Sequence, residues 1–197
     1  MTLHSKAKEH RTPQYYVQEM FYTRWSPRAM TGEEVSKEEL LSLFEAARWA
    51  PSAFNEQPWR FIVAHTKEER EKFLHFLIEF NQEWCKNSAA LVVIVSKKNF
   101  THNNKENKTH EFDTGAAWMS LSLEGARRGL VVHGMSGILY DKIKQELVIP
   151  EDYEIHAMCV IGKYADASLL SEDMAKEEIP SQRKNMNDIV QWGTFTP

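Results

Sequence analysis

The stretch AARWAPSAFNEQPWRFIV, residues 46–63, decides the fold because it joins one predicted helix to one predicted strand through a short corner. The residues before it repeat apolar side chains at helical spacing, and Pro51 ends that helix because proline disfavours helical geometry at the preceding residue. The letters WRFIVA, residues 59–64, form an apolar run that indicates a buried strand. A helix therefore passes to a strand through one turn.

The corner itself is rigid and polar. Pro51 and Pro58 restrict the backbone on either side of Ser52, Asn55 and Gln57. An amide side chain both donates and accepts hydrogen bonds, so fixed Asn and Gln side chains complement a ring edge with alternating C=O and N–H groups. The alternative is an ordinary turn after a helix, in which Ser and Asn only satisfy nearby backbone groups. The residues of the corner leave both interpretations open.

The rest of the chain predicts further helices and strands on both sides of this stretch. Capping signals open helices at Ser36 and Thr66, and the strands are continuous apolar runs. We therefore expect a mixed α and β protein with a central sheet covered by helices on both faces. Helices are expected at residues 12–22, 36–50, 66–80, 113–128 and 140–147, and strands at residues 59–64, 90–95, 130–133 and 153–164. One face of the last strand should carry Ile155, Ala157, Cys159 and Ile161.

Three segments lie outside these elements. Residues 97–112 are almost wholly polar and are expected to form an exposed loop or lid. Residues 1–11 are expected to be flexible, and residues 165–197 to form an extended tail. No linker rich in Pro, Gly or Ser divides the chain, so residues 1–197 are expected to form a single domain.

Composition excludes several classes of protein. The 24 basic and 28 acidic side chains leave a net charge of -4, so the chain has no broad cationic surface for nucleic acid. The longest apolar run, residues 91–95, is too short to cross a bilayer, and the polar start lacks the apolar core of a secretory signal. We expect a cytoplasmic protein that binds neither nucleic acid nor membrane. The histidines and the two cysteines show no metal-ligand spacing, so no metal site is expected.

Two further patterns could hold a ligand. In an extended stretch, alternate side chains point the same way, so Arg24, Ser26 and Arg28 would present two guanidinium groups and a hydroxyl on one side, suited to an anion. The alternative is a solvated surface turn. After a predicted strand, the turn GMSG, residues 134–137, could bring backbone N–H groups close to a flat ligand. The alternative there is a plain turn.

Taken in order, five motifs resemble the nitroreductase family of FMN-dependent oxidoreductases. They are RWSPR (residues 24–28), AARWAPSAFNEQPWRFIV (46–63), DTGAAWMSLSLEGARRGL (113–130), GMSG (134–137) and PSQRK (180–184). The resemblance runs from about Val17 to Trp192, nearly the whole chain.

The resemblance implies an α+β fold with a central, mostly antiparallel sheet flanked by helices on both faces, in an intertwined homodimer with an FMN at each of two subunit interfaces. The tail is expected to pack on the partner subunit. By this resemblance the residues that hold FMN are Arg24, Trp25, Ser26, Arg28, Met135, Ser136, Gly137, Arg183 and Lys184, with Pro51, Ser52, Ala53, Asn55 and Gln57 reaching the flavin from the partner. Arg28 is expected near the pyrimidine end of the ring, where a cation stabilises the reduced flavin.

The resemblance also implies the reaction. NADH or NADPH would pass hydride to N5 of FMN and leave, and a nitroaromatic, quinone or similar acceptor would then be reduced, in a ping-pong cycle. The cofactor carries this chemistry, so no catalytic side chain is expected. Three alternatives stay open: a flavin protein that stores or senses FMN without turnover, a different flavin reaction such as dehalogenation or azoline oxidation, and an interaction domain without a cofactor.

Overall fold

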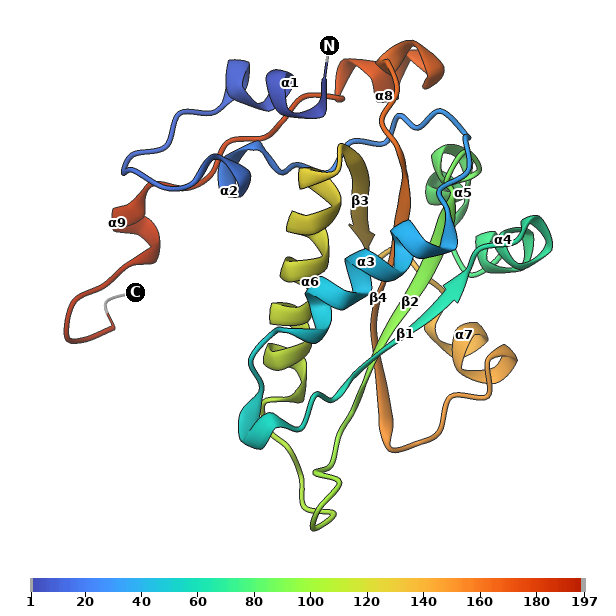
Figure 1. Cartoon of the computed structure of the whole chain (residues 1–197), viewed down its shortest axis with the longest axis vertical. Helices are drawn as coiled ribbons and strands as arrows, with labels where there is room; N and C mark the ends of the chain where they lie inside the picture. Colours follow the sequence, from blue (N-terminus) through green and yellow to red (C-terminus); the bar gives the residue numbers. More distant parts are fainter. Residues whose placement is uncertain (1, 196–197) are drawn as a thin grey trace.

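The computed structural model describes residues 2–195 and contains a four-stranded, wholly antiparallel sheet (Figure 1). The strands lie in the order β1-β2-β4-β3, so β1 and β3 are the two edges. This confirms the α+β class with an antiparallel central sheet. The strands are β1 (Trp59–Ala64), β2 (Ala90–Lys97), β3 (Leu130–Met135) and β4 (Tyr153–Lys163).

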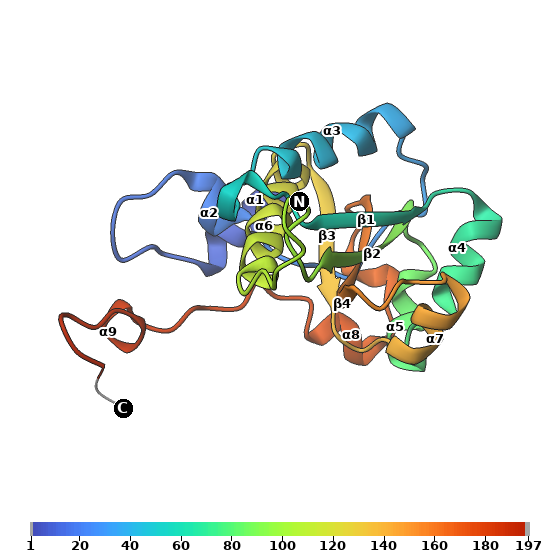
Figure 2. The same ribbon diagram turned by 90° about the horizontal axis from the view of Figure 1, so that it is seen from below.

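Helices cover both faces of the sheet, and the central strand β2 shows why (Figure 2). Leu91 and Val93 pack with the helices of one face, whereas Val92 and Ile94 pack with those of the other. Both faces of β2 are therefore buried, so residues 90–95 of the strand are all apolar even though the sheet is antiparallel. One face carries α3 (Lys37–Arg48) and α6 (His110–Arg127); the other carries α4 (Lys67–Leu74), α5 (Glu79–Cys85), α7 (Tyr140–Glu146) and α8 (Glu172–Lys176).

A β-bulge interrupts the pairing of β2 with β4. Ile94 pairs with Ala157 and Val95 pairs with Ile155, so His156 is the extra residue between them. The expectation that Ile155 shares a face with Cys159 and Ile161 is wrong, because Ile155 packs in the opposite cluster. One extra residue moves every side chain beyond it to the other face of a strand.

The helix starts are set by local capping. The Ser36 hydroxyl accepts from the N–H of Glu39, and Thr66 and Glu69 form a complete capping box. The single helix expected over residues 66–80 is wrong, since α4 and α5 are separate. Between them the backbone bonds to residues 137–139 instead of continuing the helix: Ile78 N–H donates to the Gly137 carbonyl at 3.2 Å, and the Phe76 carbonyl accepts from Leu139 N–H at 2.8 Å.

The N-terminal segment differs from expectation in two ways. Where we expected flexible chain, the structure has helix α1 (Leu3–His10), whose Leu3 and Ala7 are buried against Trp25. Met1 lies outside the described residues. The helix expected over residues 12–22 is reduced to α2 (Glu19–Thr23). Tyr15 and Tyr16 are exposed, so residues 12–18 lack a buried apolar face that would stabilise a helical turn.

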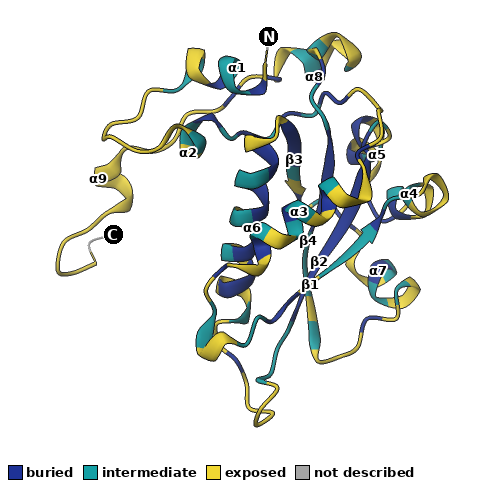
Figure 3. Cartoon of the chain, viewed as in Figure 1, coloured by how far each residue is buried: buried dark blue, intermediate teal, exposed yellow. Residues whose placement is uncertain are grey.

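The C-terminal segment has two parts. Up to Glu178 it packs on its own chain, where Met174 is buried beneath the sheet and Glu178 is 2% exposed. Beyond it the chain is extended, and the short helix α9 (Met186–Ile189) leads away from the body (Figure 3). The chain is thus extended only after residue 178, and residues 196–197 lie outside the described part. Within residues 2–195 no helix has the length and apolar character needed to span a membrane.

Candidate functional site

A cavity of about 670 Å³ runs along α6 on the side of β3 and β4. Its volume suits a small-molecule ligand. It follows the helix from Glu111 to Ser122, about 16 Å at about 1.5 Å per residue. Four of the residues expected in the site line it: Arg24, Ser26, Met135 and Ser136.

The segment RWSPR has the alternating geometry that the sequence predicts. Trp25 is buried, whereas Arg24 and Ser26 are partly exposed, and the Arg24 guanidinium donates to the Ser26 hydroxyl at 3.1 Å. Trp25 was expected in the site and lies away from the cavity. Its indole N–H donates to the Leu3 carbonyl at 3.0 Å, and its ring packs on Tyr164. Trp25 therefore fixes the segment to α1 and directs the alternate side chains outward.

Arg28 shares the face of Arg24 and lies outside the cavity lining. Arg28 follows Arg24 by four residues, which is about 13 Å in an extended chain that rises about 3.3 Å per residue. Its guanidinium lies over the Phe80 ring, 5.8 Å from the centroid, and 3.9 Å from a carboxylate oxygen of Glu177. The structure thus separates Arg28 from the pair Arg24 and Ser26, and its contact with FMN stays a prediction.

Three arginines gather beyond the Arg24 end of the cavity. Burial lowers the pKa of Arg24, and the positive charge of Arg183 lowers it further. Arg183 and Lys184 line a neighbouring cavity of about 500 Å³, together with Arg11. Within residues 2–195 no carboxylate lies within ion-pair distance of Arg11, Arg24 or Arg183. The cluster therefore holds positive charge that an anion could neutralise.

Two glycines shape the middle of the cavity. A Cβ at Gly134 would lie 2.9 Å from the Trp118 ring, so glycine is needed for β3 to approach α6. At Gly115, which lines the cavity within α6, an added Cβ would meet nothing within 4 Å. Glycine inside a helix costs about 0.5–1 kcal/mol relative to alanine. The open space beside Gly115 leaves room for a ligand to approach the backbone of α6.

The turn after β3 divides its residues between two roles. Met135 and Ser136 line the cavity, whereas Gly137 does not. The Gly137 carbonyl accepts from the Asn81 side chain at 3.1 Å and from Ile78 N–H at 3.2 Å. Gly137 therefore anchors the turn to the break between α4 and α5, and its expected contact with FMN stays a prediction.

The corner after α3 is strained. Phe54, Asn55 and Gln57 have φ of 51°, 56° and 50°, in the left-handed region that non-glycine residues rarely adopt. Such strain costs about 1–3 kcal/mol per residue and collects at functional sites. The corner is held by the buried Asp113 carboxylate, which accepts from Ala53 N–H at 3.0 Å, and by the Ser52 hydroxyl, which accepts from Gln57 N–H at 3.0 Å.

The corner and the segment RWSPR contact opposite ends of α6 (Figure 1). The corner bonds to Asp113, and Trp25 packs on Ala126. These two helix positions are about 20 Å apart at about 1.5 Å per residue. The corner residues expected in the site, which do not line the Arg24 cavity of the described chain, are Pro51, Ser52, Ala53, Asn55 and Gln57.

The polar loop beside the corner belongs to the same structural unit. The Phe54 ring meets that of Phe100 at 5.5 Å, and the Glu56 carboxylate accepts from Thr101 N–H at 2.8 Å. A loop was expected over residues 97–112; it spans residues 98–109, since β2 ends at Lys97 and α6 begins at His110. Its residues 101–106 are exposed as expected, whereas Asn107 is buried. The loop covers the corner and not the Arg24 end of the cavity.

One cluster at the cavity was not anticipated from the sequence. The buried Ser96 hydroxyl lies 2.7 Å from Nδ1 of His110 and 2.6 Å from Nε2 of His156, which lines the cavity. The hydroxyl has one proton, so when both rings are neutral it donates to one ring and accepts from the other. Burial lowers the pKa of His156. The three residues share no sequence spacing, and the bulge that turns His156 toward the cavity leaves no signal in the sequence.

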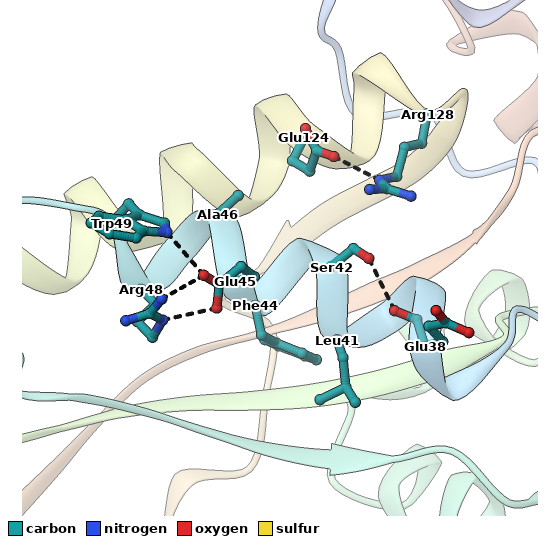
Figure 4. Close-up of a pocket in the computed structure, with 10 residues that line it drawn as sticks. All are labelled: Glu38, Leu41, Ser42, Phe44, Glu45, Ala46, Arg48, Trp49, Glu124 and Arg128. Carbon is teal, nitrogen blue, oxygen red and sulfur yellow. Dashed lines mark hydrogen bonds and ion pairs between the residues drawn. The ribbon is translucent and has the colours of Figure 1, made fainter.

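A second hollow, between α3 and α6, has different chemistry (Figure 4). The Arg48 guanidinium bonds the Glu45 carboxylate at 2.5 and 2.8 Å, and Trp49 N–H donates to the same group at 2.9 Å. Arg128 likewise donates to Glu124 at 2.7 Å. These guanidinium groups already have carboxylate partners, so this hollow does not present the unpaired cations found near Arg24.

The fold and the site define a class: an α+β protein with arginines that have no carboxylate partner in the described residues at one end of a cavity along α6. The sequence model of the nitroreductase family matches residues 22–83 and 76–163, more than half of the chain. The chain belongs to the nitroreductase family.

Relatives and solved structures agree with this assignment. A protein of Archaeoglobus fulgidus is 40% identical over 79 residues, covering 40% of this chain and 45% of that protein. The oxygen-insensitive NADPH nitroreductase of Helicobacter pylori is 38% identical over 65 residues, covering 33% of this chain and 30% of that protein. The chain thus aligns with less than half of the length of these two relatives.

Among solved structures, one described as an oxidoreductase containing FMN has a TM-score of 0.90 and 42% identity, covering 94% of this chain and 96% of that chain. A protein of Exiguobacterium sibiricum, solved in complex with FMN, has a TM-score of 0.74 and 24% identity, covering 92% of this chain and 100% of that chain. The second likeness shows the fold alone.

Proposed function

We propose that this protein is an FMN-dependent oxidoreductase that passes hydride from NADH or NADPH to organic acceptors such as quinones and nitroaromatics. The observation that carries the proposal is the charge of Arg24, which lines a cavity of suitable size and lies close enough to Arg183 of the neighbouring cavity for the Arg183 charge to lower its pKa. Within the described residues neither guanidinium group has a carboxylate within ion-pair distance. The names of similar proteins support the choice of cofactor and donor: one similar structure contains FMN, and the Helicobacter pylori relative is named an NADPH nitroreductase.

The residues present fit FMN. Arginine forks suit a phosphate dianion, because planar donors pair with two oxygens at once, and Ser26 adds a hydroxyl. Trp118 and Met119 give the cavity an apolar wall, and the recess at Gly115 leaves room for a flat ring. The donor set therefore matches a ligand that is anionic at one end and planar at the other.

FMN, when bound, supplies the two-electron hydride chemistry. The part of this chain is to bind and orient. Arg24 and Ser26 would hold the phosphate end, and the wall formed by Trp118 and Met119 would exclude water from one side of the ring. We assign no side chain as a catalytic acid or base in this proposal, since solvent can deliver the proton.

We further propose a homodimer in which the corner of one protomer completes the site of the other. The corner lies about 20 Å along α6 from the contact of the RWSPR segment. Its strain indicates a functional role that its own Arg24 cavity does not use. The tail also carries apolar side chains with no cover on this chain: Trp192 is 91% exposed and Phe195 is 85% exposed. Packing of the tail on the partner subunit would cover them.

Two measurements separate this function from its alternatives. Purified protein incubated with FMN and freed of excess should retain the flavin absorbance bands; colourless protein would indicate a domain without this cofactor. Anaerobic mixing with NADH or NADPH should bleach the flavin at a rate compatible with turnover. A spectrum that stays oxidised would indicate a storage or sensor protein, and bleaching without reduction of any quinone or nitro compound would indicate a different flavin reaction.

Arg24→Ala, with Arg28→Ala as matched control, tests the site. Both changes remove a charge from the same face of one segment, but only Arg24 lines the cavity. We expect Arg24→Ala to weaken FMN binding about tenfold to a hundredfold, the size of a lost charged hydrogen bond, and Arg28→Ala to weaken it less. Flavin fluorescence titration measures both. A larger loss with Arg28→Ala would contradict the assignment of the phosphate to the Arg24 end.

A further inference from the structure

Arg11 connects two segments that are far apart in the sequence. Its Nε donates to the Ser181 carbonyl at 2.8 Å, and its Nη1 donates to the carbonyls of Tyr22 at 3.0 Å and Arg24 at 2.8 Å. One guanidinium group thus holds the backbone of the RWSPR segment against that of the PSQRK segment. The motifs of the sequence did not include Arg11.

The charges around Arg11 oppose this arrangement. Burial, together with the positive charges of Arg183 and Arg24, lowers the pKa of Arg11 to about 10. No carboxylate lies within ion-pair distance of Arg11 in the described chain. Backbone carbonyls fix its orientation and leave its charge uncompensated. Three cations are therefore held together where an anion would stabilise all of them.

A second brace joins the same two segments. Glu178 is 2% exposed, and its Oε1 accepts from the N–H groups of Arg28 at 2.7 Å and Ala29 at 2.9 Å. It lies on the chain shortly before Arg183. Glu178 therefore holds the start of the extended tail against the RWSPR segment. Arg11 holds the tail three residues further on, at Ser181. Two independent contacts therefore fix the spacing between the segment that contains Arg24 and the segment that contains Arg183.

We propose that Arg11 is a positioning residue of the phosphate site, which sets the distance between Arg24 and Arg183 so that both guanidinium groups meet one phosphate. The inference rests on the function proposed above and adds how the site is built. Lysine in place of Arg11 would keep the charge and lose the planar fork that bonds carbonyls of two segments at once. Arg11→Lys therefore separates bridging from charge.

The test compares FMN with riboflavin, which lacks the phosphate. Dissociation constants for both are measured by flavin fluorescence for the wild type, for Arg11→Lys and for Arg48→Lys; Arg48 is an exposed arginine that already pairs with Glu45 and serves as control. We expect Arg11→Lys to weaken FMN binding about tenfold or more and to change riboflavin binding less than about twofold. Arg48→Lys should change neither.

The outcomes distinguish the roles. Equal losses for FMN and riboflavin would reduce Arg11 to a general structural contact, and unchanged binding of both would show that charge alone suffices; either result overturns the proposal. A parallel thermal shift with inorganic phosphate needs no flavin. If phosphate stabilises the wild type but not Arg11→Lys while FMN does not bind, the positioning role stands and the proposed cofactor fails. If the wild type responds to neither ligand, both proposals fail.

Discussion

At the scale of single residues, the burial of His133 beside the RWSPR segment makes the stability of the fold depend on pH. Its Nδ1–H donates to the Pro27 carbonyl at 3.0 Å, and its ring lies 4.7 Å from that of Trp84. Burial is the largest cause that lowers its pKa from 6.5 to about 4; the charges of Arg28 and Arg24 act in the same direction, and the hydrogen bond to Pro27 opposes them. The folded chain therefore keeps His133 neutral where the unfolded chain would protonate it.

This predicts a loss of stability in acid. Between pH 6.5 and about 4 the unfolded state binds one proton more than the folded state, so the free energy of unfolding falls as the pH falls through that window. We expect a loss of about 1–3 kcal/mol from this residue. His133→Phe, which keeps a ring against Trp84 and cannot titrate, should lose less. Urea unfolding at pH 7 and pH 4.5 measures the difference, and parallel losses in both proteins would contradict it.

Individual site residues were predictable where local geometry decides. Arg24 and Ser26 alternate with the buried Trp25, and this pattern can be read from an extended segment alone. Whether two side chains on one face reach the same cavity depends on what packs beneath each. The Arg28 guanidinium contacts the Phe80 ring and the Glu177 carboxylate, and both of these residues come from distant segments. Sequence spacing contains no information about those contacts.

At the scale of elements, α6 carries the main compromise between stability and binding. Gly115 lies inside the helix with open space at its Cβ position, so Gly115→Ala should raise stability by about 0.5–1 kcal/mol. Gly115→Leu should also favour the helix while its side chain fills the cavity. We therefore expect Gly115→Leu to weaken FMN binding without loss of stability. Thermal unfolding and flavin titration on the same samples measure the two effects.

Gly125 in the same helix is the matched control. A Cβ there would collide with the Val132 side chain, so Gly125→Ala should lower the unfolding temperature. If Gly115→Ala also lowers the unfolding temperature, the space beside Gly115 is not open. If Gly115→Leu binds FMN as well as the wild type does, the planar ring does not lie against this part of α6.

The elements that the sequence predicted well are those with local signals. Thr66 begins α4 by a capping box, and Pro51 follows the end of α3. The break between α4 and α5 has no such signal, because it arises from backbone bonds to residues 137–139. The bulge at His156 likewise depends on pairing with β2, and it determines which side chains face the cavity.

At the scale of the whole molecule, the proposed homodimer makes a prediction about shared sites. Arg24→Ala subunits and Asn55→Gly subunits, differently tagged, are mixed and the heterodimer is isolated. Glycine is chosen because Asn55 has positive φ, which glycine adopts without strain. If the corner serves the partner, one of the two sites carries both changes and the other carries neither. The heterodimer should therefore bind about one FMN per dimer at a concentration that leaves both variant homodimers empty.

Occupancy of the heterodimer decides between two arrangements. If Arg24 and Asn55 of one protomer served the same site, each site of the heterodimer would carry one change and both would stay empty. A protein that binds FMN as a monomer, measured by sedimentation with flavin absorbance, would contradict the shared site outright. Trp192→Ser tests the tail separately, since loss of an apolar contact with the partner should weaken the dimer without altering the cluster around Arg24.

The sequence by itself determined the fold class, the order of the strands along the chain, the caps of α3 and α4, and the motifs that identify the family. These depend on neighbouring residues, whose periodicity and backbone preferences act over a few positions. Only the tertiary structure decided that residues 3–10 form a helix, that Arg28 faces Phe80 and Glu177, and that Arg11 joins two distant segments. Such contacts form between groups far apart in the chain, so the residues around either partner carry no sequence pattern that predicts them.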